Sequence, residues 1–406
     1  MSAAASHSIG GYVTRGFEGV RDAFAENFER RGELGAACCA YRGGENVVDV
    51  WGGTRNRQTG EPWERDTMVI VYSATKGLAA MTLAIAHSRG WLDYDDRVSR
   101  YWPEFGQRGK ERITVRQLLA HQAGLYALDV PLDRALVMNP DRLADVLARQ
   151  TPVWEPGTRQ AYHAITLGFY ESELLRRIDP QHRTLGQFFQ DEIASPLGLD
   201  VYIRLPERIP NSRLAVLSRP SWLDIFRGFP LRLAIDAMNP RSNITRALRG
   251  SELADDEPRV YARNLEVPSG GAVGTARAIA HAYGVFATHG DELGLRQTTL
   301  DLLAAPAIPP ARGFYDECMK IDGVQFSLGF MKPGSAVAFG SSSASFGSPG
   351  AGGAFGFADP ALGVGYAYVT NGMGTRLSGD PRDVALRDAL RSAIGAESTG
   401  SGRAVA

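Results

Sequence analysis

The two residues of this sequence best suited to chemistry are Ser73 and Lys76, which stand three apart in the segment YSATKGL. Residues three apart on a helix are neighbours, with Cβ atoms roughly 5–6 Å apart. The stretch that follows, GLAAMTLAIA (77–86), carries no charge, which predicts a helix buried nearly all round. Burial disfavours the charged form of a lysine and lowers its pKa. A hydroxyl beside such an amine, at a helix N-terminus that favours negative charge, is typical of an activated nucleophile.

The same pattern also has a purely structural interpretation, in which Ser73 caps the helix and Lys76 extends along it to solvent. Ser-x-x-Lys arises often by chance, so the spacing alone is a weak signal. The apolar helix behind the pair is what favours the catalytic interpretation. A proton shuttle and donors for an oxyanion are still required. Two alternatives are absent from the sequence: no serine stands in a Gly-x-Ser-x-Gly elbow, and there is no H-E-x-x-H motif.

Composition and charge exclude several classes of function. The 406 residues are 44% hydrophobic and 22% charged, which is ordinary for a globular protein of two or three domains. A net charge of −1 gives no general attraction to nucleic acid or to a membrane surface. Cys38, Cys39 and Cys318 form neither a disulfide framework nor a zinc spacing. With no signal-peptide pattern and no long apolar run, we expect a cytoplasmic protein without metal, cofactor, nucleic-acid or membrane partners.

The order of the predicted elements indicates the fold class. Strand-like runs occur near both ends of the chain, and helical patterns dominate between them. This order predicts an α/β lobe whose antiparallel sheet joins the N- and C-terminal segments (11–72 and 265–395), with an inserted all-helical lobe (73–264) and a disordered tail (396–406). Helices are expected at 17–31, 73–86, 115–119, 144–149, 165–177, 185–193, 275–287 and 381–394, with caps at Thr114 and Thr184. Strands are expected at 35–41, 46–51, 68–72, 325–331, 337–339, 354–357 and 364–369.

A stretch rich in proline and arginine, 204–264, is harder to interpret. It carries four large apolar residues that could line a pocket or pack against the helical lobe: Trp222, Phe226, Phe229 and Leu231. The glycine-rich stretch 347–356 lacks the lysine of a P-loop and precedes a strand, so it predicts no phosphate site.

Six segments in order along the chain carry a resemblance to a known family. They are YSATKGL, DYDDRVSRYWPEF, ITVRQLLAHQAGL, WEPGTRQAYHAITLGFYESELLRR, TLGQFFQDEIASPLGLD and FGSPGAGGAFGFADPALGVGYAYV. They resemble successive blocks of the serine β-lactamase-like superfamily, most of all the class C-like esterases called family VIII carboxylesterases. The resemblance extends over residues 15–395 and implies an α/β lobe plus a helical lobe, with the site between them.

The resemblance implies roles for particular residues. Ser73 would be the acylated nucleophile, Lys76 its partner, and Tyr162, in the second motif Tyr162-His163-Ala164, the general base and acid. The third motif aligns with Ser348-Pro349-Gly350, so that the backbone N–H groups of Ser73 and Ala351 would form the oxyanion hole. Ser348, Gly350 and His163 would contact the substrate. A small ester is the expected substrate; a β-lactamase, a D-aminopeptidase, an acyltransferase or a non-catalytic binding relative are the alternatives.

Two features of these motifs leave questions open. A tyrosine acts as a base at neutral pH only if cations stabilise its phenolate, so an ionised Tyr162 requires a protonated Lys76. This competes with the neutral lysine inferred from burial, and the sequence does not decide between them. In addition, Ala164 stands where β-lactamases have asparagine, and Ser348 stands where they have lysine. Both departures favour an esterase over a β-lactamase.

Overall fold

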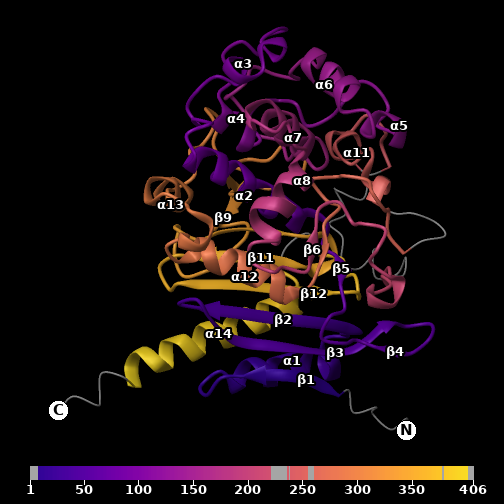
Figure 1. Cartoon of the computed structure of the whole chain (residues 1–406), viewed down its shortest axis with the longest axis vertical. Coiled ribbons are helices and arrows are strands. Elements are labelled where there is room, and N and C mark those ends of the chain that lie inside the picture. Colours follow the sequence, from indigo (N-terminus) through magenta and orange to yellow (C-terminus); the bar gives the residue numbers. More distant parts are fainter. Residues whose placement is uncertain (1–7, 221–235, 237, 255–259, 377–378, 401–406) are drawn as a thin grey trace.

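A large antiparallel sheet organises this computed structural model, which describes residues 8–220, 236, 238–254, 260–376 and 379–400 (Figure 1). The strand order is β1-β3-β2-β12-β11-β10-β9-β8, and β4 pairs with β3. The N-terminal strands are β1 (Ile9–Val13), β2 (Gly35–Arg42), β3 (Glu45–Asn56) and β4 (Glu61–Pro62). The C-terminal strands are β8 (Gln325–Ser327), β9 (Phe330–Lys332), β10 (Phe346–Pro349), β11 (Phe355–Asp359) and β12 (Val364–Thr370). The pairing of β2 with β12 joins the two ends of the chain into one sheet, as predicted.

Helices cover both faces of this sheet, and the side chains of its strands differ accordingly. On the outer face, α1 (Glu18–Arg30) and α14 (Pro381–Gly400) pack over large aromatic residues such as Phe357 and Tyr366. On the inner face, α12 (Ala276–Ala287) packs over alanine and glycine. A Cβ on Gly365 would lie 2.1 Å from the backbone nitrogen of Gly284, so the small residues let α12 approach closely. The central strands are therefore buried on both sides.

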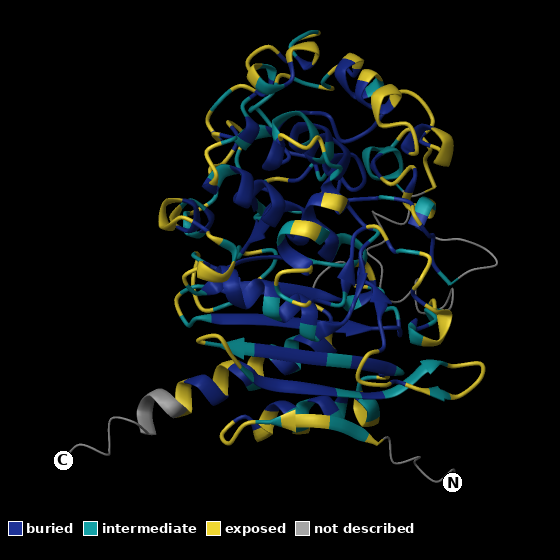
Figure 2. Ribbon diagram, in the orientation of Figure 1, coloured by how far each residue is buried: buried dark blue, intermediate teal, exposed yellow. Residues whose placement is uncertain are grey.

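The helical part of the molecule lies beyond α12, in the upper half of Figure 1. Its centre is α2 (Thr75–Ser88), which is buried at every position but His87, as the uncharged sequence predicts. Buried segments fill the middle of the molecule and exposed positions lie on the outer helices (Figure 2). The surrounding helices are α3 (Val98–Tyr101), α4 (Val115–Leu119), α5 (Arg134–Val137), α6 (Pro140–Arg149), α7 (Thr166–Ile178), α8 (Leu185–Phe189), α11 (Asn243–Ala247) and α13 (Gln297–Ala304).

A small sheet connects the helical part to the start of α2. Its strands are β5 (Val69–Ile70), β7 (Val273–Gly274) and β6 (Val201–Tyr202), in the order β5-β7-β6. Because β5 ends two residues before Tyr72, this sheet fixes the place where the chain turns into α2.

Among the described helices, none is long and apolar enough to cross a membrane.

Local signals in the sequence predicted most elements correctly. Thr114 and Thr184 each accept a hydrogen bond from a backbone N–H three residues later, which confirms both caps. The strand expected at 325–331 is instead two strands, β8 and β9, because Leu328 and Gly329 have φ of 50° and 88° and form a tight turn. Residues 337–339 form no strand.

Two further expectations were wrong or lie outside the described residues. Helix α14 continues to Gly400, in place of the disordered tail expected from Ala396. The tail residues 401–406 lie outside the described residues, as do Trp222, Phe226, Phe229 and Leu231.

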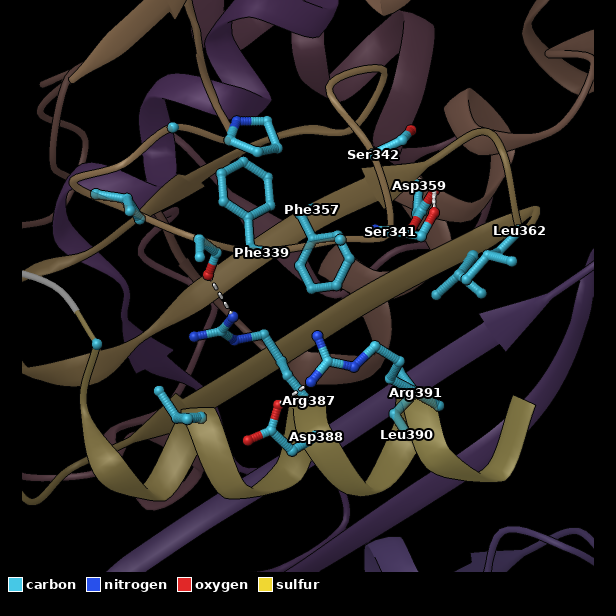
Figure 3. A pocket seen from close by; sticks show the side chains of 18 of the residues that line it. Phe339, Ser341, Ser342, Phe357, Asp359, Leu362, Arg387, Asp388, Leu390 and Arg391 are labelled. Carbon is cyan, nitrogen blue, oxygen red and sulfur yellow. Dashed lines mark hydrogen bonds and ion pairs between the residues drawn. The ribbon is translucent and has the colours of Figure 1, made fainter. Parts of the chain in front are cut away.

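A cavity of about 620 Å³ lies on the outer side of the sheet, between α14 and the segment after β9. Its walls combine Phe339, Phe357 and Leu390 with the arginines Arg387 and Arg391 (Figure 3). These side chains come from the face of the sheet opposite α12 and α2. The cavity is therefore separate from the residues whose chemistry the sequence predicts.

Candidate active site

Ser73 lies in a single turn of 3-10 helix, Tyr72–Ala74, that leads directly into α2. The residue before it, Tyr72, has φ of 44°, a left-handed conformation that is unfavourable for a bulky side chain. Such strain is concentrated at functional sites, where the surrounding structure holds it in place. Ser73 itself is half-buried and lies in this sharp turn.

The amine of Lys76 lies in the interior behind Ser73, with only 2% of the residue exposed. Its Nζ atom is 2.7 Å from the carbonyl oxygen of Ala164, 2.8 Å from that of Ser269 and 3.3 Å from Oγ of Ser73. A neutral amine has two N–H donors and one lone pair. The two carbonyls can accept both donors, which leaves the lone pair to face the hydroxyl of Ser73.

Burial shifts this amine towards its neutral form. Burial lowers the pKa of Lys76 to about 7, and the negative charge of Glu171 opposes that shift. The Nζ atom also lies 4.7 Å from the centre of the Tyr162 ring. A cation over an aromatic face is weakly stabilised, but not enough to offset full burial. Lys76 is thus able to change protonation state near neutral pH.

Tyr162 completes the group around Ser73. Its ring stacks on Phe326 at 5.8 Å and lies 5.2 Å from the ring of His121, which fixes its position before α7. Burial raises the pKa of Tyr162 above its usual value, and a hydrogen bond with Ser73 only partly offsets this. The nearby carboxyl group of Asp316 raises that pKa further. The phenol is therefore neutral at physiological pH.

The third motif brings the end of β10 against the turn that holds Ser73. Oγ of Ser348 donates a hydrogen bond of 2.7 Å to the carbonyl oxygen of Ser73. A Cβ on Gly350 would lie 2.1 Å from the carbonyl oxygen of Val71, so only glycine permits this approach. Ala351 follows at an exposed position, at the start of the 3-10 turn Ala351–Gly353.

His163 and His121 are both buried close to Lys76. His121 accepts a hydrogen bond of 3.0 Å from the backbone N–H of His163. Burial lowers the pKa of His163 to about 3 and that of His121 well below its usual value, and the charge of Lys76 adds to both shifts. Both imidazoles are therefore neutral. Because His163 has no exposed surface, its predicted contact with substrate gains no support and stays a prediction.

The structure brings together most residues that the sequence singled out. Ser73, Lys76 and Tyr162 are in contact, and Ser348 and Gly350 lie against the same turn. The roles assigned to these residues and to Ala351 stay predictions. The carbonyls of Ala164 and Ser269 and the carboxyl of Glu171 could not be recognised from the sequence, because they leave no signal in residue type or spacing. No metal-binding group of three or more His, Cys, Asp or Glu residues occurs within the described part of the chain.

This fold and this arrangement define a protein of the β-lactamase and penicillin-binding-protein class. The β-lactamase family matches residues 20–391, so the chain belongs to that family. In sequence it is 32% identical over 364 residues to the esterase/β-lactamase LipL of Mycobacterium tuberculosis, covering 87% of this chain and 81% of LipL.

Solved structures agree with this assignment. A family VIII carboxylesterase superposes with a TM-score of 0.81 at 33% identity, covering 95% of this chain and 100% of the other. EstA from Arthrobacter nitroguajacolicus superposes with a TM-score of 0.80 at 31% identity, covering 95% of this chain and 98% of EstA. A penicillin-binding protein homolog from Caulobacter crescentus superposes with a TM-score of 0.80 at 33% identity, covering 95% of this chain and 100% of the homolog. The resemblance to family VIII carboxylesterases and the predicted fold class are thereby confirmed.

Proposed function

We propose that this protein is a carboxylesterase that hydrolyses small carboxylic esters through an acyl-enzyme on Ser73. The observation that carries the proposal is the placement of the Lys76 amine. Its Nζ atom lies within hydrogen-bond distance of the carbonyl oxygens of Ala164 and Ser269 and of Oγ of Ser73. Membership of the β-lactamase family, and similarity to LipL and to a family VIII carboxylesterase, support the same reaction class.

In the first half-reaction, Lys76 accepts the hydroxyl proton of Ser73 while Oγ forms a bond to the ester carbonyl carbon. The carbonyl oxygen becomes an oxyanion, for which we assign the backbone N–H groups of Ser73 and Ala351 as donors. The ester C–O bond then breaks. The departing alkoxide receives a proton from Tyr162, which Lys76 replenishes, so an alcohol leaves and the acyl group stays on Ser73.

In the second half-reaction, water takes the place of the alcohol. It loses a proton along the same route, its oxygen bonds to the acyl carbon, and the bond to Oγ of Ser73 breaks. The carboxylic acid is released and Ser73 regains its proton. No cofactor is needed at any step.

The choice of Lys76 as the resting base rests on burial, which lowers the pKa of Lys76 and raises that of Tyr162. Burial disfavours the ammonium form of Lys76 and the phenolate form of Tyr162 alike. The neutral amine is a competent base, whereas the neutral phenol is a competent acid. We therefore assign the base to Lys76 and the proton relay to Tyr162.

A β-lactam is the less suitable substrate for this site. β-Lactamases must hold an amide side chain and a ring carboxylate, which require a side-chain amide and a cation or strong donor. Ala164 offers no polar side-chain group, and its carbonyl already binds Lys76. Ser348 offers a hydroxyl that donates to the backbone of Ser73. A small ester requires neither contact.

The proposal is tested by measuring intact mass after exposure to p-nitrophenyl butyrate, a penicillin and a fluorophosphonate in parallel. The fluorophosphonate should add once, at Ser73, and the Ser73→Ala variant should show neither labelling nor ester turnover. Rapid hydrolysis of the penicillin, without a lasting penicilloyl adduct and faster than ester turnover, would instead indicate a β-lactamase. Labelling of Ser343 or Ser348, or turnover that survives Ser73→Ala, would contradict the proposed mechanism.

A further inference from the structure

The most unusual buried group near the site is the carboxyl of Glu171, in the middle of α7. Glu171 has no exposed surface, and neither of its oxygens has a hydrogen-bond partner among the described residues. A buried acid without partners is strongly destabilising, so such groups are rare unless they serve a function. Its neighbour Glu173 shows the ordinary arrangement, because it pairs with Arg176 and Arg177.

The position of Glu171 links it to the lysine of the site. An ideal Cβ built on Gly329, in the turn between β8 and β9, would lie 2.9 Å from Oε1 of Glu171 and 2.7 Å from Cβ of Ala80. Ala80 follows Lys76 by four residues on the buried helix α2, so the carboxyl lies against the face of α2 that carries Lys76. The negative charge of Glu171 raises the pKa of Lys76, and the positive charge of Lys76 lowers the pKa of Glu171.

We propose that Glu171 is a positioning residue that holds or releases a proton to set the charge of Lys76. This inference rests on the proposed function, because it concerns the base of that reaction. With its carboxyl protonated, Glu171 leaves Lys76 free to be the neutral amine that accepts the proton of Ser73. With its carboxyl ionised, Glu171 stabilises the ammonium ion that forms as Ser73 attacks. In a low-dielectric interior these interactions extend over several ångströms.

Among the described residues, Lys76 is the charge that acts on Glu171. Lys332, on β9, is also buried with its pKa lowered to about 7, but its amine donates to the carbonyls of Leu303 and Ala344. Burial raises the pKa of Tyr94 and lowers those of His121 and His163, so none of them titrates near neutral pH. Of the helices packed on α7, α2 carries Lys76 and the half-buried His87, whose pKa is lowered by burial. The others add no buried charge within the described residues: α8 has no ionisable side chain, and the charges of α3, α4 and α6 lie at exposed or half-buried positions. They are Arg100, Arg116, Asp141, Arg142, Asp145 and Arg149. By contrast, burial raises the pKa of Glu171 to about 8, which is close to the pKa of about 7 of Lys76.

The test compares the wild type with Glu171→Gln, which keeps the shape but cannot ionise. The measured quantity is the rate of fluorophosphonate labelling of Ser73 against pH. Two coupled groups lose protons in two macroscopic steps, so the wild-type profile should be broad. Glu171→Gln should give a single step, moved to lower pH by about half a unit or more, because the charge that favours the ammonium form is gone. Profiles that superimpose would overturn the proposal.

A matched control and a stability measurement separate this role from a structural one. Glu173→Gln, on the same helix, breaks two ion pairs and should lower the melting temperature without moving the profile. Glu171→Leu removes an unpartnered carboxyl, so the melting temperature of this variant should stay the same or rise. Its pH profile of labelling should match that of Glu171→Gln. A lower melting temperature with an unmoved profile would assign Glu171 a structural role and overturn the proposal. Absence of any Ser73 labelling in the wild type would instead contradict the proposed function.

Discussion

The hydroxyl of Ser348 donates a hydrogen bond of 2.7 Å to the backbone carbonyl of Ser73, across 275 residues of sequence. This contact joins β10 to the strained turn that contains Ser73, the proposed nucleophile. Because Ser348 is only 5% exposed, its hydroxyl is placed to hold that turn. Ser348 thus stabilises the backbone of Ser73.

Loss of this bond should therefore affect turnover more than binding. We expect Ser348→Ala to lower kcat for p-nitrophenyl butyrate about tenfold, the usual worth of one hydrogen bond, with KM little changed. Fluorophosphonate should still label Ser73. Ser348→Thr keeps the hydroxyl and serves as the control, with most of the activity retained. An unchanged kcat with a raised KM would show that Ser348 binds substrate instead.

Lys76 and Tyr162 should behave as one unit with Ser73. We predict that Lys76→Ala and Tyr162→Phe each reduce kcat on the order of 10³-fold or more, and that the double variant is little worse than either. His163→Ala should be mild by comparison, because its neutral imidazole is not needed to carry a proton. An inactive His163→Ala beside an active Tyr162→Phe would reverse the assigned roles.

The pH dependence of ester hydrolysis should follow Lys76. At low pH the ammonium form has no lone pair for the proton of Ser73, so kcat/KM should rise with pH through the lowered pKa of about 7. The raised pKa of Tyr162 keeps the phenol neutral above that range, so a plateau should follow. Steady-state rates from pH 5 to 9.5 measure the midpoint. A midpoint that moves in His163→Ala but not in Glu171→Gln would show that the titration does not belong to Lys76.

Esters should be better substrates than β-lactams. One missing charge-assisted hydrogen bond is worth about 1.5–3 kcal/mol, and the site lacks two contacts that β-lactams require. We expect a higher kcat/KM for p-nitrophenyl butyrate than for nitrocefin. The double variant Ala164→Asn with Ser348→Lys tests the cause and should gain nitrocefin turnover. Faster hydrolysis of nitrocefin by the wild type would refute the esterase assignment.

The glycine after Lys76 is required by packing, and this can be tested with a second-site change. A Cβ on Gly77 would lie 1.8 Å from Oη of Tyr283, a hydroxyl that is buried and unpartnered among the described residues. Gly77→Ala should therefore lower the free energy of unfolding by about 1–3 kcal/mol. Tyr283→Phe alone should be neutral or slightly stabilising, and it should partly rescue Gly77→Ala. Denaturant unfolding of the four proteins measures the coupling, and strictly additive effects would contradict the contact.

Features set by neighbouring residues could be predicted from the sequence. The spacing of Ser73 and Lys76, the buried helix α2 and the caps at Thr114 and Thr184 all depend on residues within a few positions of one another. The alternation of strands and helices also gave the sheet that joins both ends of the chain. The tight turn at Leu328 and Gly329 was not predicted, because the apolar pattern of 325–331 does not show where a strand ends and the chain reverses.

Only the tertiary structure decided the surroundings of Lys76 and Glu171. The partners of Lys76 at Ala164 and Ser269 lie 88 and 193 residues away, and they are backbone carbonyls, which every residue type possesses. Glu171 occupies an ordinary position in an amphipathic helix, and its isolation from any partner exists only once α2, α7 and the β8–β9 turn close around it. Residue type determined which groups could do chemistry. Burial and the direction of backbone groups, which depend on how distant segments pack, determined which proton each of them holds.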